Sequence, residues 1–480
     1  MKVYWKIQNV LHWAGVAYVL LLAGCCAPRS NVWTNPQSGK WEDEGSWSFG
    51  SPSNRASIYI TNPGTKIVKI DQYTTSGKFH STLSINDLTV AGTVGCSNIL
   101  ELVDAGTNVP LQVADSLTLG TAGGPGFLIV SNSALNAGAL ILGSHNGSVG
   151  AMTVQGNAVV NVSSNITLSS SSLTATSSIT LDGGNFTATN GVTRIGVAGN
   201  GVLTVNGGTN IFRQIILNPK GTGSGGFLMH GGSVKIIGNG TGPGQGLVSN
   251  WVIFDGGDLD ASGTSLTIGM TTDDSQVSIP PGASGLQGQL AAMYVGYGQN
   301  TGTFSEAGFN PCELDVSNQV VLGDCISGAI GNVYLSGGSL YVTNPVHTAA
   351  LIIRNGTFNL SGDGNTNGGK LVVDNIYITN STGKFVNNGG QLIVKGRIFA
   401  TPPGLSACCS PGSVAISWPA PPPWPGSPPW PYWSLQTNSD VTNPNGWMAD
   451  GVVPTLNGGT NYISVTPSAT KLFFRLQPTW

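Results

Sequence analysis

The 480-residue sequence has very few charged residues. It contains 19 Lys and Arg and 22 Asp and Glu, so 9% of the chain is charged, against about 25% in an average globular domain. The formal net charge is −3, and no cluster of Lys and Arg occurs. Because nucleic-acid binding depends on neutralising phosphates with basic side chains, we expect no nucleic-acid partner. A disordered polyelectrolyte is excluded as well, since 40% of the residues are hydrophobic.

The motifs of several common enzyme classes are also missing. No GxSxG lies between an expected strand and helix, and the glycine-rich stretch 221–226 precedes a strand, which argues against a phosphate-binding loop. The cysteines show no CxxC spacing, and the histidines are scattered at no metal-ligand spacing. We therefore expect no enzymatic activity from these motifs and no metal site built from Cys or His.

The N-terminus has the pattern of an export signal. Lys2 and Lys6 precede an uncharged apolar run, Val10 to Gly24, which is too short for a comfortable membrane span. The run ends in Leu22-Ala23-Gly24-Cys25, which resembles the lipobox of bacterial lipoproteins. The resemblance implies that residues 1–25 hold the signal, that Cys25 is lipidated, and that the lipid attaches the protein to a membrane. Secretion without lipid and a retained helical anchor are the alternatives.

Two short apolar elements recur in alternation through the middle of the chain. One closes on Gly or a polar residue, and its closing positions are Gly120, Gly143, Ser169, Gly196, Asn218, Gly269, Gly296 and Gly323. These are 23, 26, 27, 22, 51, 27 and 27 residues apart, and we interpret the 51 as two periods with a degenerate copy between them. The other runs into paired glycines that begin at Gly183, Gly207, Gly231, Gly256, Gly337 and Gly389.

A period of 22 to 27 residues with short strands, glycine at corners and no helical periodicity is typical of a β-solenoid. We predict an all-β protein with parallel β-helix-like repeats over residues 111–400, about eleven turns, preceded by a Trp-rich β cap and first turns over 31–110. Low charge fits this fold, because equivalent side chains stack directly in register and repeated like charges would repel.

The repeats resemble a known group of proteins. Alternating strand and glycine units, headed by Trp33, Trp41, Trp47 and Pro52, are similar to exported bacterial proteins that carry autotransporter-associated β-strand repeats, often together with PEP-CTERM sorting tails. The resemblance implies a solenoid fold and export, and no particular activity. We see neither a terminal run of transmembrane strands nor a PEP-CTERM tail, so we expect the lipid on Cys25 to be the anchor.

The composition changes after residue 400. Apolar segments at 414–418, 432–436, 461–465 and 471–475 predict a small antiparallel β-sandwich over residues 401–480. A proline-rich insertion at 419–431 separates the first two segments and is expected to be a stiff projection. Its Trp424 and Trp430 are candidates for stacking on a ligand such as a sugar; alternatively, they fold back to cover the sandwich.

One segment matches the spacing of a calcium loop. Asp363, Asn365 and Asn367 alternate before Gly368, and Asp374 stands at the twelfth position, where a calcium loop usually has Glu. Oxygen ligands at alternate positions suit one hard cation, so calcium is the one cofactor that the sequence suggests. The alternative is an ordinary Gly- and Asn-rich solenoid turn, because no helices flank the segment.

Polar residues also precede the paired glycines, among them Asp182, His230 and Asp255. They either form a catalytic row, as in pectin-lyase-like solenoids, or are selected by turn geometry. A polysaccharide lyase or hydrolase would need Arg194, Arg213 or Lys220 close to the carboxylates between Asp255 and Asp274. We therefore expect a structural or adhesive lipoprotein of the cell envelope or surface that contacts polysaccharide or another surface partner; a polysaccharide-degrading enzyme is the alternative.

Overall fold

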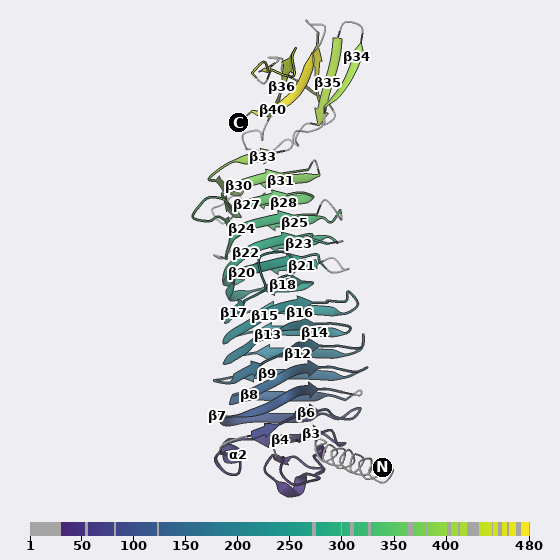
Figure 1. Ribbon diagram of the computed structural model, residues 1–480, viewed down its shortest axis with the longest axis vertical. Helices are drawn as coiled ribbons and strands as arrows, with labels where there is room; N and C mark the ends of the chain where they lie inside the picture. The colour runs from purple at the N-terminus through teal and green to yellow at the C-terminus, as the bar shows by residue number, and fades with distance from the viewer. Residues whose placement is uncertain are drawn as a thin grey trace, which may run out of the picture. The chain divides into compact units, whose positions relative to one another are not determined.

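The computed structural model describes residues 30–479, except 53–55, 81–82, 122–123, 271–274, 299, 308–311, 325–327, 363–367, 381, 401–404, 411–412, 420–431, 444, 450–453, 458–459 and 467–471. Strands make up 63% of the described residues and helices 2%. Parallel strands stack into a β-solenoid of about 13 turns, which confirms the predicted fold class (Figure 1). The prediction of about eleven turns counted only residues 111–400, and the first turns lie before residue 111. The chain forms two compact units, Met1–Phe186 and Thr187–Trp480.

Each turn of the first unit contributes to three parallel sheets. The first sheet contains β2 (Gly39–Lys40), β4 (Lys66–Ile70), the start of β7 (Asn98–Leu119), the start of β8 (Gly126–Leu142), β9 (Val149–Gln155) and β12 (Thr176–Leu181). The second contains β5 (Leu83–Ile85), the middle of β7 and β8, and β10 (Val159–Val162). The third contains β1 (Ser30–Val32), β3 (Ser57–Ile60), β6 (Asp87–Val90), the ends of β7 and β8, and β11 (Ile166–Leu168). The short helices are η1 (Glu44–Ser46) and α2 (Gln72–Ser76).

The second unit repeats this plan; β13 (Asn185–Ile195) contains the boundary between the units. Its first sheet contains β14 (Asn200–Val205), β16 (Ser224–Met229), β19 (Trp251–Phe254), β21 (Ser275–Ile279), β23 (Gly302–Glu306), β25 (Gly331–Leu335), β28 (Gly356–Ser361) and β31 (Gly383–Asn388). Its second contains β17 (Ser233–Ile236), β26 (Ser339–Val342), β29 (Lys370–Val373), β32 (Gln391–Val394) and the starts of β15 (Thr209–Leu217), β20 (Gly256–Ile268), β22 (Ser284–Val295) and β24 (Glu313–Leu322). Its third contains β18 (Leu247–Ser249), β27 (Ala350–Ile353), β30 (Asn375–Ile378), β33 (Ile398–Ala400) and the ends of β15, β20, β22 and β24.

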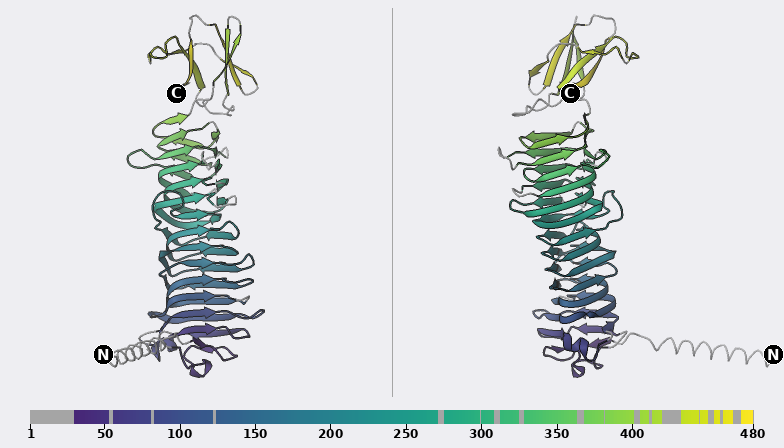
Figure 2. Two further views of the ribbon diagram at one scale, coloured as in Figure 1. Left: turned by 45° about the vertical axis from the view of Figure 1, so that its right-hand side comes forward. Right: turned by 90° about the vertical axis from the view of Figure 1, so that its left-hand side faces the viewer.

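The strand register follows the sequence repeat residue by residue. Leu117 pairs with Leu140, and Leu140 pairs with Ile166, so the first residues of successive apolar elements lie in one column. The degenerate copy expected within the 51-residue interval is β18, whose Leu247 lies between Ile215 and Leu266. Side chains alternate along these strands, and the inward ones are mostly apolar and buried. Figure 2 shows the strands of successive turns stacked one on another from two further sides. The repeats are therefore turns of the solenoid.

Backbone geometry explains why the apolar elements close on glycine. All eight closing residues have positive φ, from 48° at Asn218 to 87° at Gly269, and Ser169 and Asn218 are the two that are not glycine. In five of the six paired glycines the positive φ falls on the second one, as at Gly232 and Gly257, and in the last pair it falls on the first, Gly389. Turn geometry thus requires one glycine of each pair and places no such demand on the polar residue before the pair.

Gly323→Ala is expected to lower the free energy of unfolding by about 2 kcal/mol or more. Gly323 has a φ of 74°, which costs an L-residue about 1–2 kcal/mol, and a Cβ there would lie 2.0 Å from the carbonyl oxygen of Asn355 on the next turn. The control is Gly282→Ala, where φ is 97° but no atom lies within 4 Å of the added Cβ. Equal losses in the two variants, measured by urea unfolding, would contradict a role for the contact between turns.

Buried tryptophans cover the first turns of the first unit. Trp33 and Trp41 are fully buried, and each packs edge-on against Trp47 with ring centroids 5.0 and 5.1 Å apart. The Nε1 of Trp47 donates a hydrogen bond to the carbonyl oxygen of Trp41 at 2.9 Å. The Trp-rich segment thus supplies an apolar core where the stacked turns begin.

A buried lysine closes one of the early turns. The Nζ of Lys66 donates to the carbonyl oxygens of Asn62, Pro63 and Gly64 at 3.0, 2.6 and 2.9 Å. Burial lowers the pKa of Lys66, so these charge-assisted hydrogen bonds offset a desolvation cost. The sequence gives no sign of this inward cation, since outward lysines occupy similar strand positions.

The C-terminal residues form two antiparallel sheets. One contains β34 (Ser406–Ser410), β35 (Ser413–Pro419), β39 (Thr460–Val465) and β38 (Thr455–Asn457), and the other contains β37 (Met448–Ala449), β36 (Tyr432–Asn438) and β40 (Phe473–Thr479). Ile416 and Trp418 of the first sheet share a buried cluster with Leu435 and Leu476 of the second. The two sheets therefore pack face to face, as predicted for residues 401–480.

Candidate ligand-binding surface

The outer face of the first sheet in the second unit presents two columns of side chains. One column runs through Gly226, Trp251, Gln276, Thr303, Asn332, Thr357 and Lys384, and the other through Leu228, Ile253, Ser278, Ser305, Tyr334, Asn359 and Val386. In-register stacking places the members of a column about 4.8 Å apart, and the two columns are about 7 Å apart. Figure 1 shows β21, β23, β25, β28 and β31 lying one above another in this sheet.

Trp251 forms an exposed aromatic platform in this face. Its side chain is 42% exposed although it lies in the middle of a sheet. The six-membered ring lies over Gly226, where a Cβ would be 2.8 Å from Cε3 of the indole. Because glycine leaves this space empty, the indole can lie against the backbone of the preceding turn while much of it stays exposed. A supported, exposed aromatic ring is suited to stacking on a flat apolar ligand surface.

On the turns that follow Trp251 the face is polar and uncharged. Gln276, Ser278, Thr303, Ser305 and Asn332 project outward and are all at least partly exposed. Tyr334 is the next outward residue after Asn332 in β25 and is 44% exposed. It forms the end of this polar surface that lies farthest from Trp251. We call these residues together with Trp251 the neutral strip: Trp251, Gln276, Ser278, Thr303, Ser305, Asn332 and Tyr334. Within the described part of the chain, none of its five polar residues makes a side-chain hydrogen bond to another residue, so their donors and acceptors face solvent.

Of the acidic residues singled out in the sequence, Asp258 and Asp260 lie on the second sheet. Asp258 and Asp260 of β20 and Glu313 and Asp315 of β24 project outward, separated by one turn that carries Gln287 and Gln289. Lys235 lies 2.6 Å from Asp260, and with the Ser262 hydroxyl it lowers the pKa of that carboxyl to about 2. Burial, and to a lesser degree Glu313, raises the pKa of Asp315. This face is therefore acidic, in contrast to the neutral strip.

Two of the basic residues that a lyase would need, Arg213 and Lys220, show no contact with a carboxylate among the described residues. Arg213 donates from Nε to Asn239 at 2.9 Å. Lys220 lines a hollow of about 330 Å³ with Ile216, Pro219, Gly221, Gly244, Val248 and Met270, a described lining that contains no carboxylate. Asp255 lies 3.2 Å from Nδ1 of His230, while Asp273 and Asp274 lie outside the described residues. No observation therefore favours the lyase over the adhesive alternative.

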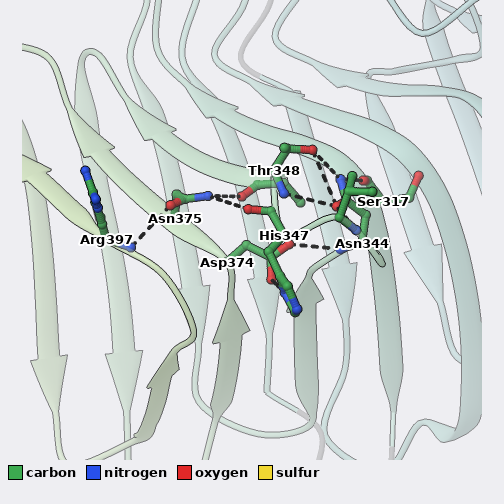
Figure 3. Close-up of polar contacts among 9 residues, drawn as sticks. Ser317, Asn344, His347, Thr348, Asp374, Asn375 and Arg397 are labelled. Atoms are coloured by element: carbon green, nitrogen blue, oxygen red, sulfur yellow. Dashed lines mark hydrogen bonds and ion pairs between the residues drawn. The ribbon is translucent and has the colours of Figure 1, made fainter.

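Asp374, the twelfth position of the predicted calcium loop, anchors a turn (Figure 3). Its carboxyl group is fully buried; Oδ2 accepts a hydrogen bond from the backbone nitrogen of Asn344 at 3.0 Å, and Oδ1 lies 3.1 Å from Nδ1 of His347. Asn344 in turn donates to the carbonyl oxygen of Ser317, and Asn375 donates to that of His347. Asp374 thus ties neighbouring turns together. Asp363, Asn365 and Asn367 lie outside the described residues, so the calcium site stays a prediction.

Asp374→Ala is expected to loosen the turn formed by residues 343–349. The variant removes the acceptor of the Asn344 amide and the partner of His347, whose φ of 56° needs support from its surroundings. We expect at least tenfold faster backbone amide exchange in this turn and a stability loss of about 1–3 kcal/mol. Asp374→Asn, which keeps an acceptor oxygen, should show a smaller effect. Unchanged exchange in Asp374→Ala would contradict the anchoring role.

Several predicted sites cannot be placed. Cys25, the signal at residues 1–25, Trp424 and Trp430 lie outside the described residues, so lipidation and ligand stacking there stay predictions. Among the described residues, no group of three or more His, Cys, Asp and Glu side chains is placed to share a metal ion. In the same part of the chain, no helix is long and apolar enough to cross a membrane.

Trp251 was missed in the sequence because its neighbours are apolar. The sequence Trp-Val-Ile-Phe shows no alternation that would mark residues 251 and 253 as outward. Its pairing with Gly226, 25 positions earlier, was the available signal, since it follows from the repeat period once the turns are aligned.

Comparison of the chain with protein-family models, curated proteins and solved structures found no match.

Proposed function

We propose that this protein is a non-enzymatic, adhesive β-solenoid that binds polysaccharide at the neutral strip. The observation that carries the proposal is the indole of Trp251, which is 42% exposed and supported by Gly226 beneath it. Exposed tryptophan is costly to leave in water, and the C–H face of a sugar ring is a flat apolar partner for it. The hydroxyl and amide groups beside it match sugar hydroxyls, which also both donate and accept hydrogen bonds.

A rigid scaffold suits this role. Inward side chains of these strands are buried and the register of the first sheet is unshifted from β19 to β25, so the outward residues are held at fixed spacing on strands rather than on loops. Binding to a repeating polymer needs this regularity more than it needs a deep pocket. Stacking on a fixed face, without a pair of carboxylates around a scissile bond, gives adhesion rather than cleavage.

We further propose that the protein is exported and held at the cell envelope or surface by a lipid on Cys25. The support is the sequence Leu22-Ala23-Gly24-Cys25 after an uncharged run. The test is to express the full chain and Cys25→Ser in a bacterium supplied with labelled fatty acid. Label in the wild type and its loss in the variant would support lipidation; label in both or in neither would overturn it.

The binding proposal is tested by depletion from solution. The purified full-length protein, Trp251→Ala and the double variant Trp424→Ala/Trp430→Ala are incubated with a panel of insoluble polysaccharides, and released sugar is measured at the same time. We expect depletion of the wild type and the double variant, at least tenfold weaker binding by Trp251→Ala, and no released product. Depletion abolished only in the double variant would move the site to 419–431, and released sugar would overturn the non-enzymatic role.

A further inference from the structure

We infer that the neutral strip is specific for an uncharged polysaccharide with an extended, ribbon-like backbone, bound along the stacking direction of the turns. This inference rests on the proposed function and names the class of ligand. It follows from the separation of the aromatic ends of the strip, the chemistry between them, and the distribution of charge around them.

The dimensions of the strip fit a single polymer chain. Trp251 and Tyr334 lie three strands apart in the first sheet, which corresponds to about 14 Å along the stack. The strip is two outward columns wide, or about 7 Å between column centres. An oligosaccharide segment one sugar wide can therefore contact both aromatic rings when it lies along the stack.

The floor between the aromatic ends lies on one face of parallel, in-register strands and carries no charge. Gln276, Thr303 and Asn332 form one column, and Ser278 and Ser305 form the other. Such straight columns favour glycans whose equatorial linkages keep the chain extended and whose axial C–H groups form flat faces for Trp251 and Tyr334. A helical glycan, such as an α-linked glucan, can present only one or two sugars to such a surface.

The charges around the strip disfavour acidic polysaccharides. The next cation in the Trp251 column is Lys384, two strands beyond Asn332. In its described strands, the neighbouring second sheet presents four carboxylates, Asp258, Asp260, Glu313 and Asp315, against two lysines, Lys235 and Lys370. A polymer with a carboxylate on each sugar would lose water without gaining an ionic partner in the strip, and the negative field of the second sheet would oppose its approach.

The test uses native gel electrophoresis of the full-length protein in gels that contain one of three soluble polymers. Hydroxyethyl cellulose and carboxymethyl cellulose share one extended backbone and differ in charge, and soluble starch is a helical neutral control. We expect retardation by hydroxyethyl cellulose and at least tenfold weaker binding to the other two. Trp251→Ala and Tyr334→Ala should each weaken binding at least tenfold, whereas Phe49→Ala, which removes an exposed aromatic ring of the first unit, should bind as the wild type does.

A variant that gains binding distinguishes a change in specificity from a loss of binding caused by misfolding. Gln276→Lys places a cation in the middle of the strip and should increase retardation by carboxymethyl cellulose at least fivefold. If carboxymethyl cellulose or starch binds the wild type as strongly as hydroxyethyl cellulose does, the inference fails while the proposed function stands. If Trp251→Ala and Tyr334→Ala bind as the wild type does, the inference fails together with the neutral strip as the binding site. If no polysaccharide in the gels or in the insoluble panel is bound, the proposed function fails with it.

Discussion

Glu306→Gln is expected to raise the free energy of unfolding by about 3 kcal/mol at pH 7. Glu306 ends β23, is only 1% exposed, and stands in register between Ile279 and Leu335. Within the described chain neither carboxylate oxygen accepts a hydrogen bond, and burial raises the pKa of Glu306 to about 8. The folded protein therefore has to keep a proton that the unfolded chain releases at an ordinary glutamate pKa of 4.5.

The sign of the pH dependence follows from this shift. Below pH 4.5 both states hold the proton, and Glu306 costs nothing through ionisation. Between pH 4.5 and about 8 the folded state binds one proton more than the unfolded state, so stability falls by about 1.4 kcal/mol per pH unit, to a total of about 5 kcal/mol. Glutamine does not titrate, so the advantage of the variant should grow with rising pH over this window.

Urea unfolding of the wild type and Glu306→Gln at pH 5, 7 and 8.5 measures the difference. Glu306→Leu should gain more, because its side chain matches Leu335 on the next turn. Glu313→Gln is the matched control, since Glu313 projects outward from β24 and its replacement should change stability by less than about 0.5 kcal/mol. An advantage of Glu306→Gln that stays constant from pH 5 to 8.5 would contradict a buried, protonated carboxyl.

Glu306 also illustrates why the sequence predicted the solenoid but not this residue. The period was readable because glycine recurs where φ is positive, as at Gly296 and Gly323, and because Leu266, Met293 and Val320 stack in register. Glu306 lies inside the 81-residue interval between paired glycines, where its own strand ends without the paired glycines that mark the equivalent strands of other turns. An acidic residue at an inward position looks like an outward one until the register is known.

The candidate site was less predictable for a related reason. Sequence patterns identify chemistry within a segment, and so directed attention to the calcium-like spacing that ends at Asp374. In the structure that carboxylate accepts a hydrogen bond from the backbone amide of Asn344, 30 positions away. Only the stacking of turns creates this contact. In the same way, the platform at Trp251 depends on the missing side chain of Gly226 on the preceding turn. Contacts between turns therefore determine both the anchoring role of Asp374 and the exposed position of Trp251.

Trp47→Ala is expected to lower the free energy of unfolding of the first turns by about 3–5 kcal/mol. Trp47 is 4% exposed and joins Trp33 and Trp41 through edge-on contacts of 5.0 and 5.1 Å, so its loss leaves a large cavity between them. The loss also removes the hydrogen bond to the carbonyl oxygen of Trp41. Because each turn of a solenoid contacts only its neighbours, the destabilisation should remain local and spread from this end of the first unit.

Hydrogen exchange resolves the location of the Trp47 effect. In Trp47→Ala, backbone amides of residues 30–70 should exchange at least a hundredfold faster, while those of residues 126–181 stay close to wild-type rates. Trp47→Phe, which keeps an aromatic ring but loses the Nε1 donor, should show an intermediate effect. Trp251→Ala is the matched control, because its exposed indole supports no core and its removal should leave exchange of the first turns unchanged. Uniform acceleration throughout residues 30–181 of Trp47→Ala would mean that these turns unfold as a single cooperative unit rather than from a capped end.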